Sequence, residues 1–284
     1  MVPKIQISLL RGVCQMPAYV AHAKGFFQDG GVQTVLDVAA TAWLVPQKLI
    51  QGESLFAVIP WTRVAAAEAE DTPLVLLAGS GCEEAAIVVR RGLKPADVRK
   101  VAIPMRGGMK DLTAIGLMET LGWRNVEQVR MPSGDGAILS LVGQGADAAS
   151  MVEPYATMLE ELGIGTVICR TGDVWKGAPG CSLSTTAKLT EDSPAIVQAV
   201  VDAFARGARF VSEHPDEAAE IAAGYIGINV RFIRESLRRN QPNLDAIRNQ
   251  AAMNQILALM QQLGYIGKQP QNYLDLRFLD AAMR

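Results

Sequence analysis

RGVCQMPAYVAHAKGFFQDGGVQTVL, residues Arg11–Leu36, is the stretch that decides the fold. The apolar run Ile5–Leu10 before it predicts a strand, and Ala18–Phe27 within it predicts a helix. Cys14 and Gln15 therefore lie where a strand passes into a helix N-terminus. In open α/β sheets this position borders the ligand crevice, and the helix N-terminus favours an anionic or polar group. We expect a ligand contact at this turn.

The composition indicates a soluble α/β protein. Of the 284 residues, 49% are hydrophobic and 20% are charged, which is enough apolar material for a large core. A formal net charge of −2 with scattered basic residues argues against a nucleic-acid partner. No run approaches the roughly 18 apolar residues of a membrane span, so we expect no stable membrane insertion. The start, MVPKIQISLL, lacks the features of a secretory signal, which leaves two alternatives: a cytosolic protein, or an exported one whose signal has been removed.

The four cysteines are Cys14, Cys82, Cys169 and Cys181, and they are widely spaced. They form no CxxC motif and no metal-type spacing, so we expect neither a metal site nor a cofactor. A disulfide between Cys169 and Cys181 is one alternative in an oxidising compartment, and free thiols are the other.

The chain reads as two similar α/β units followed by helices. The first 80 or so residues alternate strands and helices, and strand ends at Cys14, Thr41 and Trp61 are expected to meet at one sheet edge. After a turn-rich crossing, a second unit begins with the strand Val101–Pro104 and the turn Arg106–Gly108. Beyond residue 193 the pattern is almost purely helical.

Several segments, in this order and spacing, carry a resemblance to a known family. They are Gly25–Phe27 before a strand led by Gly31, Ala57–Trp61, the stretch VAIPMRGG at Val101–Gly108, Gly145–Ala148 leading to Glu153–Pro154, and a helix from Pro194 followed by His214–Pro215. Together they resemble type II substrate-binding proteins of ABC importers, in the nitrate, sulfonate, taurine and thiamin-precursor branch. The resemblance covers nearly the whole chain.

This resemblance implies the type II periplasmic-binding-protein fold: two α/β lobes, each a mainly parallel sheet flanked by helices, joined by two crossover strands. One lobe would comprise residues 1–84 plus 184–284, and the other residues 85–183. It also implies an extracytoplasmic, periplasmic or lipid-anchored monomer that performs no chemistry. Such a protein captures a small anionic or polar organic ligand, such as a sulfonate, taurine, nitrate or a pyrimidine, and delivers it to an ABC permease and its ATPase.

The candidate ligand contacts are the residues at the strand ends of both units. Arg106 offers a planar fork to an oxyanion, and the glycines after it allow a close backbone approach. Glu153 is placed to accept a hydrogen bond from an amine or hydroxyl group. The full set of candidates is Cys14, Gln15, Met16, Tyr19, Thr41, Trp61, Arg106, Gly107, Gly108, Ser133, Asp135 and Glu153.

Cys14 also supports a rival hypothesis. A thiol at a helix N-terminus can have a lowered pKa and act as a nucleophile. One enzyme of the same two-lobe fold, a hydroxybiphenyl sulfinate desulfinase, is similar in having a cysteine in its first loop. The alternative is therefore a cytoplasmic, desulfinase-like enzyme, and a third possibility is a sensor module that kept the fold without a transporter. The sequence places no histidine or aspartate beside Cys14.

Overall fold

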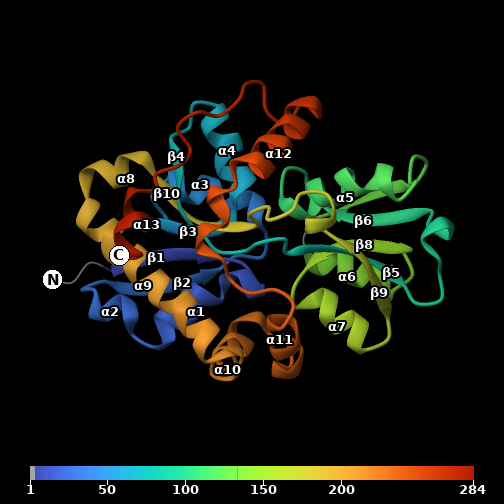
Figure 1. Cartoon of the computed structure of the whole chain (residues 1–284), viewed down its shortest axis with the longest axis horizontal. Helices are drawn as coiled ribbons and strands as arrows, with labels where there is room; N and C mark the ends of the chain where they lie inside the picture. The colour runs from blue at the N-terminus through green and yellow to red at the C-terminus, as the bar shows by residue number, and fades with distance from the viewer. Residues whose placement is uncertain (1–3, 133) are drawn as a thin grey trace.

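Two five-stranded sheets, each flanked by helices, lie at opposite ends of the computed structural model, which describes residues 4–132 and 134–284 (Figure 1). The first sheet has the order β2-β1-β3-β10-β4, with β1 (Lys4–Leu9), β2 (Gln33–Val38), β3 (Phe56–Pro60), β4 (Leu74–Gly79) and β10 (Cys181–Thr186). The second has the order β7-β6-β8-β5-β9, with β5 (Ala85–Arg90), β6 (Lys100–Pro104), β7 (Glu127–Met131), β8 (Ala148–Val152) and β9 (Gly165–Arg170). We call each sheet with its helices a lobe.

One strand in each sheet runs against the other four. β10 pairs antiparallel with β3 and β4, and β5 pairs antiparallel with β8 and β9. These two strands are the ones that the chain enters after crossing from the other lobe. The remaining strands share one direction, as the repeated strand-and-helix alternation predicts.

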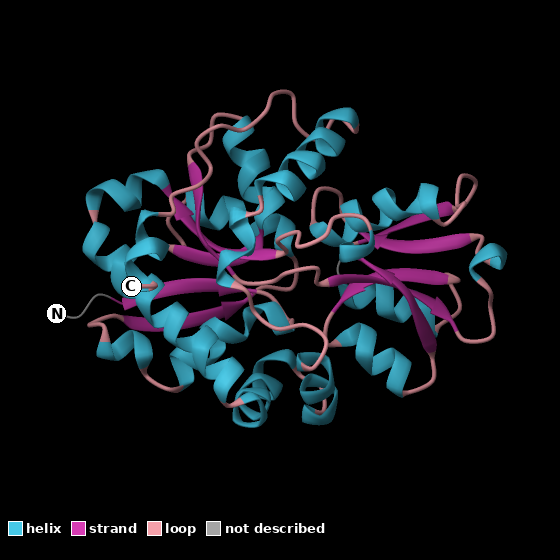
Figure 2. Ribbon diagram, in the orientation of Figure 1, coloured by secondary structure: helices cyan, strands magenta, loops and turns pink. Residues whose placement is uncertain are grey.

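Helices cover both faces of each sheet (Figure 2). In the first lobe these are α1 (Met16–Ala23), α2 (Phe26–Asp29), α3 (Val45–Ile50), α4 (Trp61–Ala69) and α8 (Ala187–Asp192). In the second lobe they are α5 (Met109–Thr120), α6 (Gly134–Val142) and α7 (Tyr155–Glu161). The strands β3, β4 and β8 are fully buried, which is typical of strands packed on both faces of a sheet.

The C-terminal part of the chain is helical, as its pattern predicts, and these helices pack on the first lobe. They are α9 (Pro194–Glu213), α10 (Pro215–Ile226), α11 (Val230–Leu237), α12 (Gln250–Gln262) and α13 (Arg277–Ala282). α9 packs along α1, and the two backbones approach so closely that a Cβ atom at Gly207 would lie 2.1 Å from the carbonyl oxygen of Pro17. α11 and α12 extend to the second lobe and contact α7 and α5.

The two crossover segments, β4 to β5 and β9 to β10, run side by side between the lobes. The amides of Ser80 and Gly81 donate to the carbonyl of Cys181 at 2.9 and 3.1 Å. The amide of Gly180 in turn donates to the carbonyl of Gly81 at 2.8 Å. These paired crossovers form one strip between the lobes, in addition to the contacts that α11 and α12 make with the second lobe.

No helix among the described residues has the length and apolar character needed to cross a membrane.

Candidate functional site

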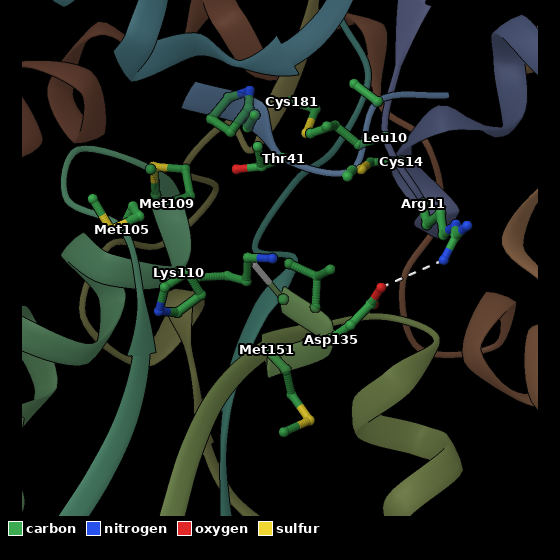
Figure 3. A pocket seen from close by; sticks show the side chains of 18 of the residues that line it. Leu10, Arg11, Cys14, Thr41, Met105, Met109, Lys110, Asp135, Met151 and Cys181 are labelled. Carbon is green, nitrogen blue, oxygen red and sulfur yellow. Dashed lines mark hydrogen bonds and ion pairs between the residues drawn. The ribbon is translucent and has the colours of Figure 1, made fainter. Parts of the chain in front are cut away.

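A cavity of about 170 Å³ lies between the two lobes (Figure 3). Strand ends of both sheets surround it: β1, β2 and β3 from the first lobe, and β6, β7 and β8 from the second. A single buried water needs only about 10–15 Å³ on the same measure, so this space suits a small organic molecule.

Much of the cavity wall is apolar. Leu10 and Val38 contribute from the first lobe, and Met105, Met109 and Met151 contribute from the second. Such a surface accommodates the apolar body of a ligand, while a few polar groups set its orientation. The flexible methionine side chains adapt to irregular shapes.

Lys110 supplies a positive charge that no described residue pairs. Its side chain extends from the first turn of α5 toward the middle of the cavity (Figure 3). Among residues 4–132 and 134–284, no side chain or backbone group forms a hydrogen bond or ion pair with its ammonium. Burial lowers the pKa of Lys110, and the neighbouring Cys181 and Glu84 partly offset this effect. An anion in the cavity would restore the stability of the charged form.

Three other charged groups at the cavity are already paired with each other or with a neighbour. Arg11, directly after β1, forms a half-exposed ion pair with Asp135 of α6 at 3.4 Å across the lobes. Asp111 is fully buried and pairs with Arg130. These contacts leave Lys110 as the group most available to a ligand.

A clasp of hydrogen bonds joins the lobes beside the cavity. We use this name for Thr62 and Arg63 of α4 with the carbonyls of residues 105–107. Thr62 Oγ1 donates to the carbonyl of Gly107 at 2.7 Å, and Arg63 donates to the carbonyls of Arg106 at 3.0 Å and Met105 at 3.5 Å. Burial lowers the pKa of Arg63 to about 10. The clasp is a first-lobe contact with a second-lobe turn, so it exists only when the lobes are closed.

Two thiols and a carboxyl group meet at the hinge side of the cavity. Cys14, Glu84 and Cys181 are all buried, and their sulfur and oxygen atoms lie within 4.8 Å of one another. Gln15 orients Cys14: its amide donates to Sγ at 3.2 Å while its Oε1 accepts from the amide of Leu10 at 3.1 Å. The spacing of the cysteines in the sequence gives no hint of this cluster, because β10 reaches the first sheet only after the chain has formed the second.

The thiols of this cluster are held in their protonated form. A hydrogen bond with Cys181 lowers the pKa of Cys14, but burial and the charge of Glu84 outweigh it, so the Cys14 pKa is raised. The hydrogen bond with Cys14 and burial raise the pKa of Cys181 further. Nucleophilic cysteines need the opposite shift, so this geometry does not support the desulfinase-like alternative. All four cysteines are free thiols, and Cys169 lies on β9, away from Cys181.

Of the predicted contacts, five line the cavity: Cys14, Gln15, Thr41, Gly108 and Asp135. Ser133 lies outside the described residues. The cavity is also lined by five residues that were not among the predicted contacts: Arg11, Arg63, Glu84, Lys110 and Cys181. Proximity to a strand end is the sequence feature that indicates Arg11 and Lys110, since each follows the end of a strand by a few residues.

Three predicted contacts are core residues instead. Met16, Tyr19 and Trp61 are fully buried and do not line the cavity. Tyr19 donates its hydroxyl to the carbonyl of Leu10 and stacks on Tyr225 with ring centroids 4.5 Å apart. Each stands near a helix start, but its side chain packs in the hydrophobic core of the first lobe.

Arg106 and Gly107 lie at the turn before α5 but outside the cavity. Arg106 is exposed and borders a shallow surface hollow with Gly107 and Tyr265. Gly107 has a φ of 84°, which favours glycine, and its amide donates to Asp111 at 2.8 Å. The turn therefore positions α5 and the clasp, while the side chain of Arg106 points away from the cavity.

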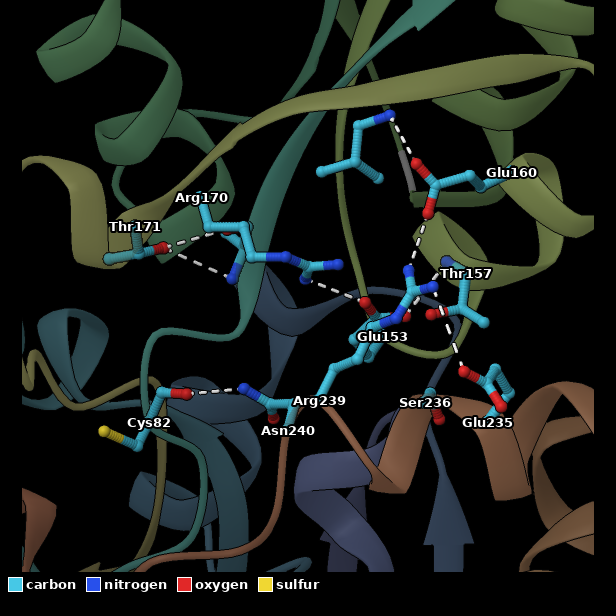
Figure 4. A network of polar contacts seen from close by, with 12 residues as sticks. Cys82, Glu153, Thr157, Glu160, Arg170, Thr171, Glu235, Ser236, Arg239 and Asn240 are labelled. Carbon is cyan, nitrogen blue, oxygen red and sulfur yellow. Dashed lines mark hydrogen bonds and ion pairs between the residues drawn. The ribbon is translucent and has the colours of Figure 1, made fainter.

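Glu153 belongs to the hinge region rather than the cavity (Figure 4). Its buried carboxylate pairs with Arg170 at 2.8 Å and accepts a hydrogen bond from the amide of Thr157 at 3.0 Å. Nearby, Arg239 of the first lobe pairs with Glu160 of α7 at 2.6 Å. This network ties the base of the second lobe to the C-terminal helices.

Comparison with known proteins gives one family and many similar folds. Residues 2–226 match the model of the NMT1-like family. No curated protein sequence matches the chain. A zinc-bound ligand-binding component of an ABC-type import system from Staphylococcus aureus is 15% identical, with a TM-score of 0.86 and 99% of each chain covered.

Two further solved structures have the same fold. The alkanesulfonate-binding protein SsuA from Xanthomonas axonopodis pv. citri, bound to MOPS, is 12% identical over 96% of this chain and 98% of that chain, with a TM-score of 0.79. The periplasmic nitrate-binding protein NrtA from Synechocystis is 16% identical over 82% of this chain and 69% of that chain, with a TM-score of 0.73. The predicted type II periplasmic-binding-protein fold is confirmed.

Proposed function

The chain belongs to the NMT1-like family, and from this premise we propose that it is the substrate-binding component of an ABC importer. Its ligand is a small organic anion with an apolar body, such as a sulfonate or a carboxylate. The observation that carries this proposal is the ammonium of Lys110, which enters a partly apolar interlobe cavity and has no hydrogen-bond or ion-pair partner among the described residues. The solved structures with this fold that bind sulfonates and nitrate support the choice of an anion.

Capture would proceed by closure of the lobes around the ligand. The ligand would contact Lys110 and the methionines of the second lobe, and Thr41 and the Cys14–Gln15 turn of the first lobe. The lobes would be residues 1–84 plus 184–284 and residues 85–183, moving about the paired crossover segments. A ligand that bridges both sides favours the closed state by the difference between its affinities for the two states.

The closed protein would then dock on an ABC permease, which releases the ligand into the membrane channel while its ATPase supplies the energy. This role places the protein on the extracytoplasmic side of the membrane as a monomer that performs no chemistry.

The proposal is tested by titrating a panel of small anions while following the melting temperature and the heat of binding. The panel contains taurine, alkanesulfonates, aromatic carboxylates, nitrate and bicarbonate. A ligand present at 100 times its Kd stabilises the folded state by about 2.7 kcal/mol, which is readily seen as a rise in melting temperature. The function is contradicted if no anion raises the melting temperature and a sulfinate is turned over instead.

Lys110→Met, with Arg106→Met as the matched control, tests the role of the ammonium. Both substitutions remove a basic side chain from the same turn and helix start, but only Lys110 reaches the cavity. A hydrogen bond to a charged group contributes about 1.5–3 kcal/mol, so Lys110→Met should weaken the binding of the best anion by at least tenfold. Arg106→Met should bind as the wild type does. A loss confined to Arg106→Met would reverse the assignment.

A further inference from the structure

We propose that Cys14, Glu84 and Cys181 bind one thiophilic divalent metal ion, for which Zn²⁺ is the fitting probe, with a fourth coordination position open to the cavity. The three side chains come from the turn after β1, from the end of the crossover that leads to β5, and from the start of β10. They form the one set of at least three His, Cys, Asp or Glu side chains, within residues 4–132 and 134–284, whose ligand atoms are grouped closely enough to hold an ion.

The spacing of the ligand atoms fits a tetrahedral ion. Zn–S bonds of about 2.3 Å and Zn–O bonds of about 2.0–2.2 Å place ligand atoms of one site about 3.6–3.8 Å apart. Cys181 Sγ lies 3.2 Å from Glu84 Oε1, and all three ligand atoms lie within 4.8 Å of one another. Small rotations of the side chains are sufficient to reach the metal-bound distances.

An unpartnered carboxylate oxygen is the independent sign of a ligand. Glu84 is 3% exposed, and its Oε2 makes no hydrogen bond to any described residue. Burying such an oxygen without a partner is costly. Two glycines nonetheless make room for it: a Cβ at Gly81 would lie 1.8 Å from Oε2, and one at Gly180 would lie 2.3 Å from Cδ. The backbone on both sides is thus shaped around a carboxyl group.

The charges also balance when the ion is bound. Two thiolates and one carboxylate carry three negative charges, and a divalent ion with the ammonium of Lys110 carries three positive charges. Neutrality of this kind reduces the cost of burying ions. Binding displaces one proton from each thiol and one from the carboxylic acid wherever these groups are protonated, because metal ligands must be deprotonated.

A metal ion at this position would link the crossover strip to the turn that lines the cavity. Glu84 lies in the crossover from β4 to β5 and Cys181 is the first residue of β10, whereas Cys14 lies in the turn that lines the cavity. An ion held by all three would fasten the hinge strip to that turn and present its open position to the cavity. The site itself is defined by these three residues and does not depend on the identity of the organic ligand.

The test uses the full chain, reduced and stripped with a chelator, with no organic ligand added. Quantification of the four thiols confirms reduction before each titration. Zn²⁺ is then titrated in competition with a chromophoric chelator, and Co²⁺ is used for its thiolate charge-transfer absorption and tetrahedral d–d bands. We expect one equivalent of Zn²⁺, both Co²⁺ signatures, and a rise in melting temperature on Zn²⁺ addition.

Cys181→Ser and Glu84→Gln should each weaken Zn²⁺ binding at least 100-fold, whereas Cys82→Ser and Cys169→Ser should leave it unchanged. Circular dichroism of each variant shows whether it is folded, and Glu84→Gln serves if a cysteine variant is not. The proposal is overturned if the folded wild type binds no Zn²⁺, if Co²⁺ shows no thiolate band, or if the control variants lose as much. Anion binding to the metal-free chain is measured separately, so loss of one activity leaves the other interpretable.

Discussion

Removal of the clasp should open the lobes and weaken ligand binding without changing the fold. Arg63→Ala deletes the guanidinium that donates to the carbonyls of Arg106 and Met105, and Thr62→Val deletes the hydroxyl that donates to the carbonyl of Gly107. Because all three acceptors belong to the other lobe, these bonds stabilise the closed state alone.

The magnitude follows from the geometry. The 3.0 Å bond from Arg63 is charge-assisted and contributes about 1.5–3 kcal/mol, while the 3.5 Å bond lies at the limit of hydrogen bonding and adds little. Burial lowers the pKa of Arg63 to about 10, which shows that removing its charge from water offsets part of the gain. We therefore expect the lower end of the range, about tenfold weaker binding. Thr62→Val removes a neutral bond of about 0.5–1.5 kcal/mol, or roughly two- to tenfold.

Calorimetry with the best anion of the panel measures the affinity, and small-angle scattering of the ligand-free protein measures the opening. Arg63 also lines the cavity, so Thr62→Val is the cleaner variant because Thr62 does not. Arg106→Ala is the matched control, since only its backbone carbonyl takes part in the clasp. Wild-type affinity and wild-type scattering dimensions in both Thr62→Val and Arg63→Ala, or an equal loss in Arg106→Ala, would refute the reasoning.

Three further predictions concern charged groups. Burial lowers the pKa of Lys110 in the empty cavity, and a bound anion should raise it. The affinity for the anion should therefore be constant below the lowered pKa and fall as pH rises toward the pKa of the complex. Calorimetry in buffers of different ionisation enthalpy should detect proton uptake on binding, and Lys110→Met should abolish that uptake. Burial raises the pKa of Glu84, so its stabilising contribution is complete below the ordinary value of about 4.3 and is lost as pH rises through the raised pKa. Metal-free Glu84→Gln should therefore melt at or above the wild-type temperature at pH 8 and lose this advantage near pH 4, and a constant difference across that range would contradict the assignment. Glu153→Gln should cost about 1–3 kcal/mol in urea unfolding because it leaves the partly buried Arg170 without its partner, whereas Glu127→Gln at an exposed pair should cost less than about 0.5 kcal/mol.

The fold could be predicted from the sequence because its pattern is local. Alternating apolar runs and helical segments indicated most strands of both sheets and the long helix α9. The edge strand β9, GTVICR at Gly165–Arg170, was not predicted, and its buried and exposed residues do not alternate regularly. The sequence pattern also did not predict that β5 and β10 run antiparallel to their neighbours. The pairing direction is set by how the chain crosses between the lobes and not by the residues of the strand itself.

The site could be predicted only in part, from the rule that ligands of open α/β sheets bind where the strands end. That rule located Cys14, Gln15, Thr41, Gly108 and Asp135 at the cavity, but it does not say which side of a helix start faces the ligand. Met16, Tyr19 and Trp61 turn toward the core for this reason. Arg106 and Lys110 lie four positions apart at one strand end, and the later one reaches the cavity because it lies within the first turn of α5.

The charges around the cavity together restrict the charge of the ligand more than any single residue does. Among the basic side chains that line the cavity, Arg11 pairs with Asp135, Arg63 donates to the clasp carbonyls, and Lys110 has no partner among the described residues. In the metal-free chain, a monoanion can therefore pair with the ammonium of Lys110, whereas the second charge of a dianion meets no further unpartnered cation among the described lining residues. A sulfonate should therefore bind more tightly than a phosphate monoester of the same carbon skeleton at pH 8, where the phosphate carries about two charges. The preference should diminish when the phosphate is titrated to its monoanion below its second pKa of about 6. Equal affinities at both pH values would show that Lys110 is not the charge that selects the ligand.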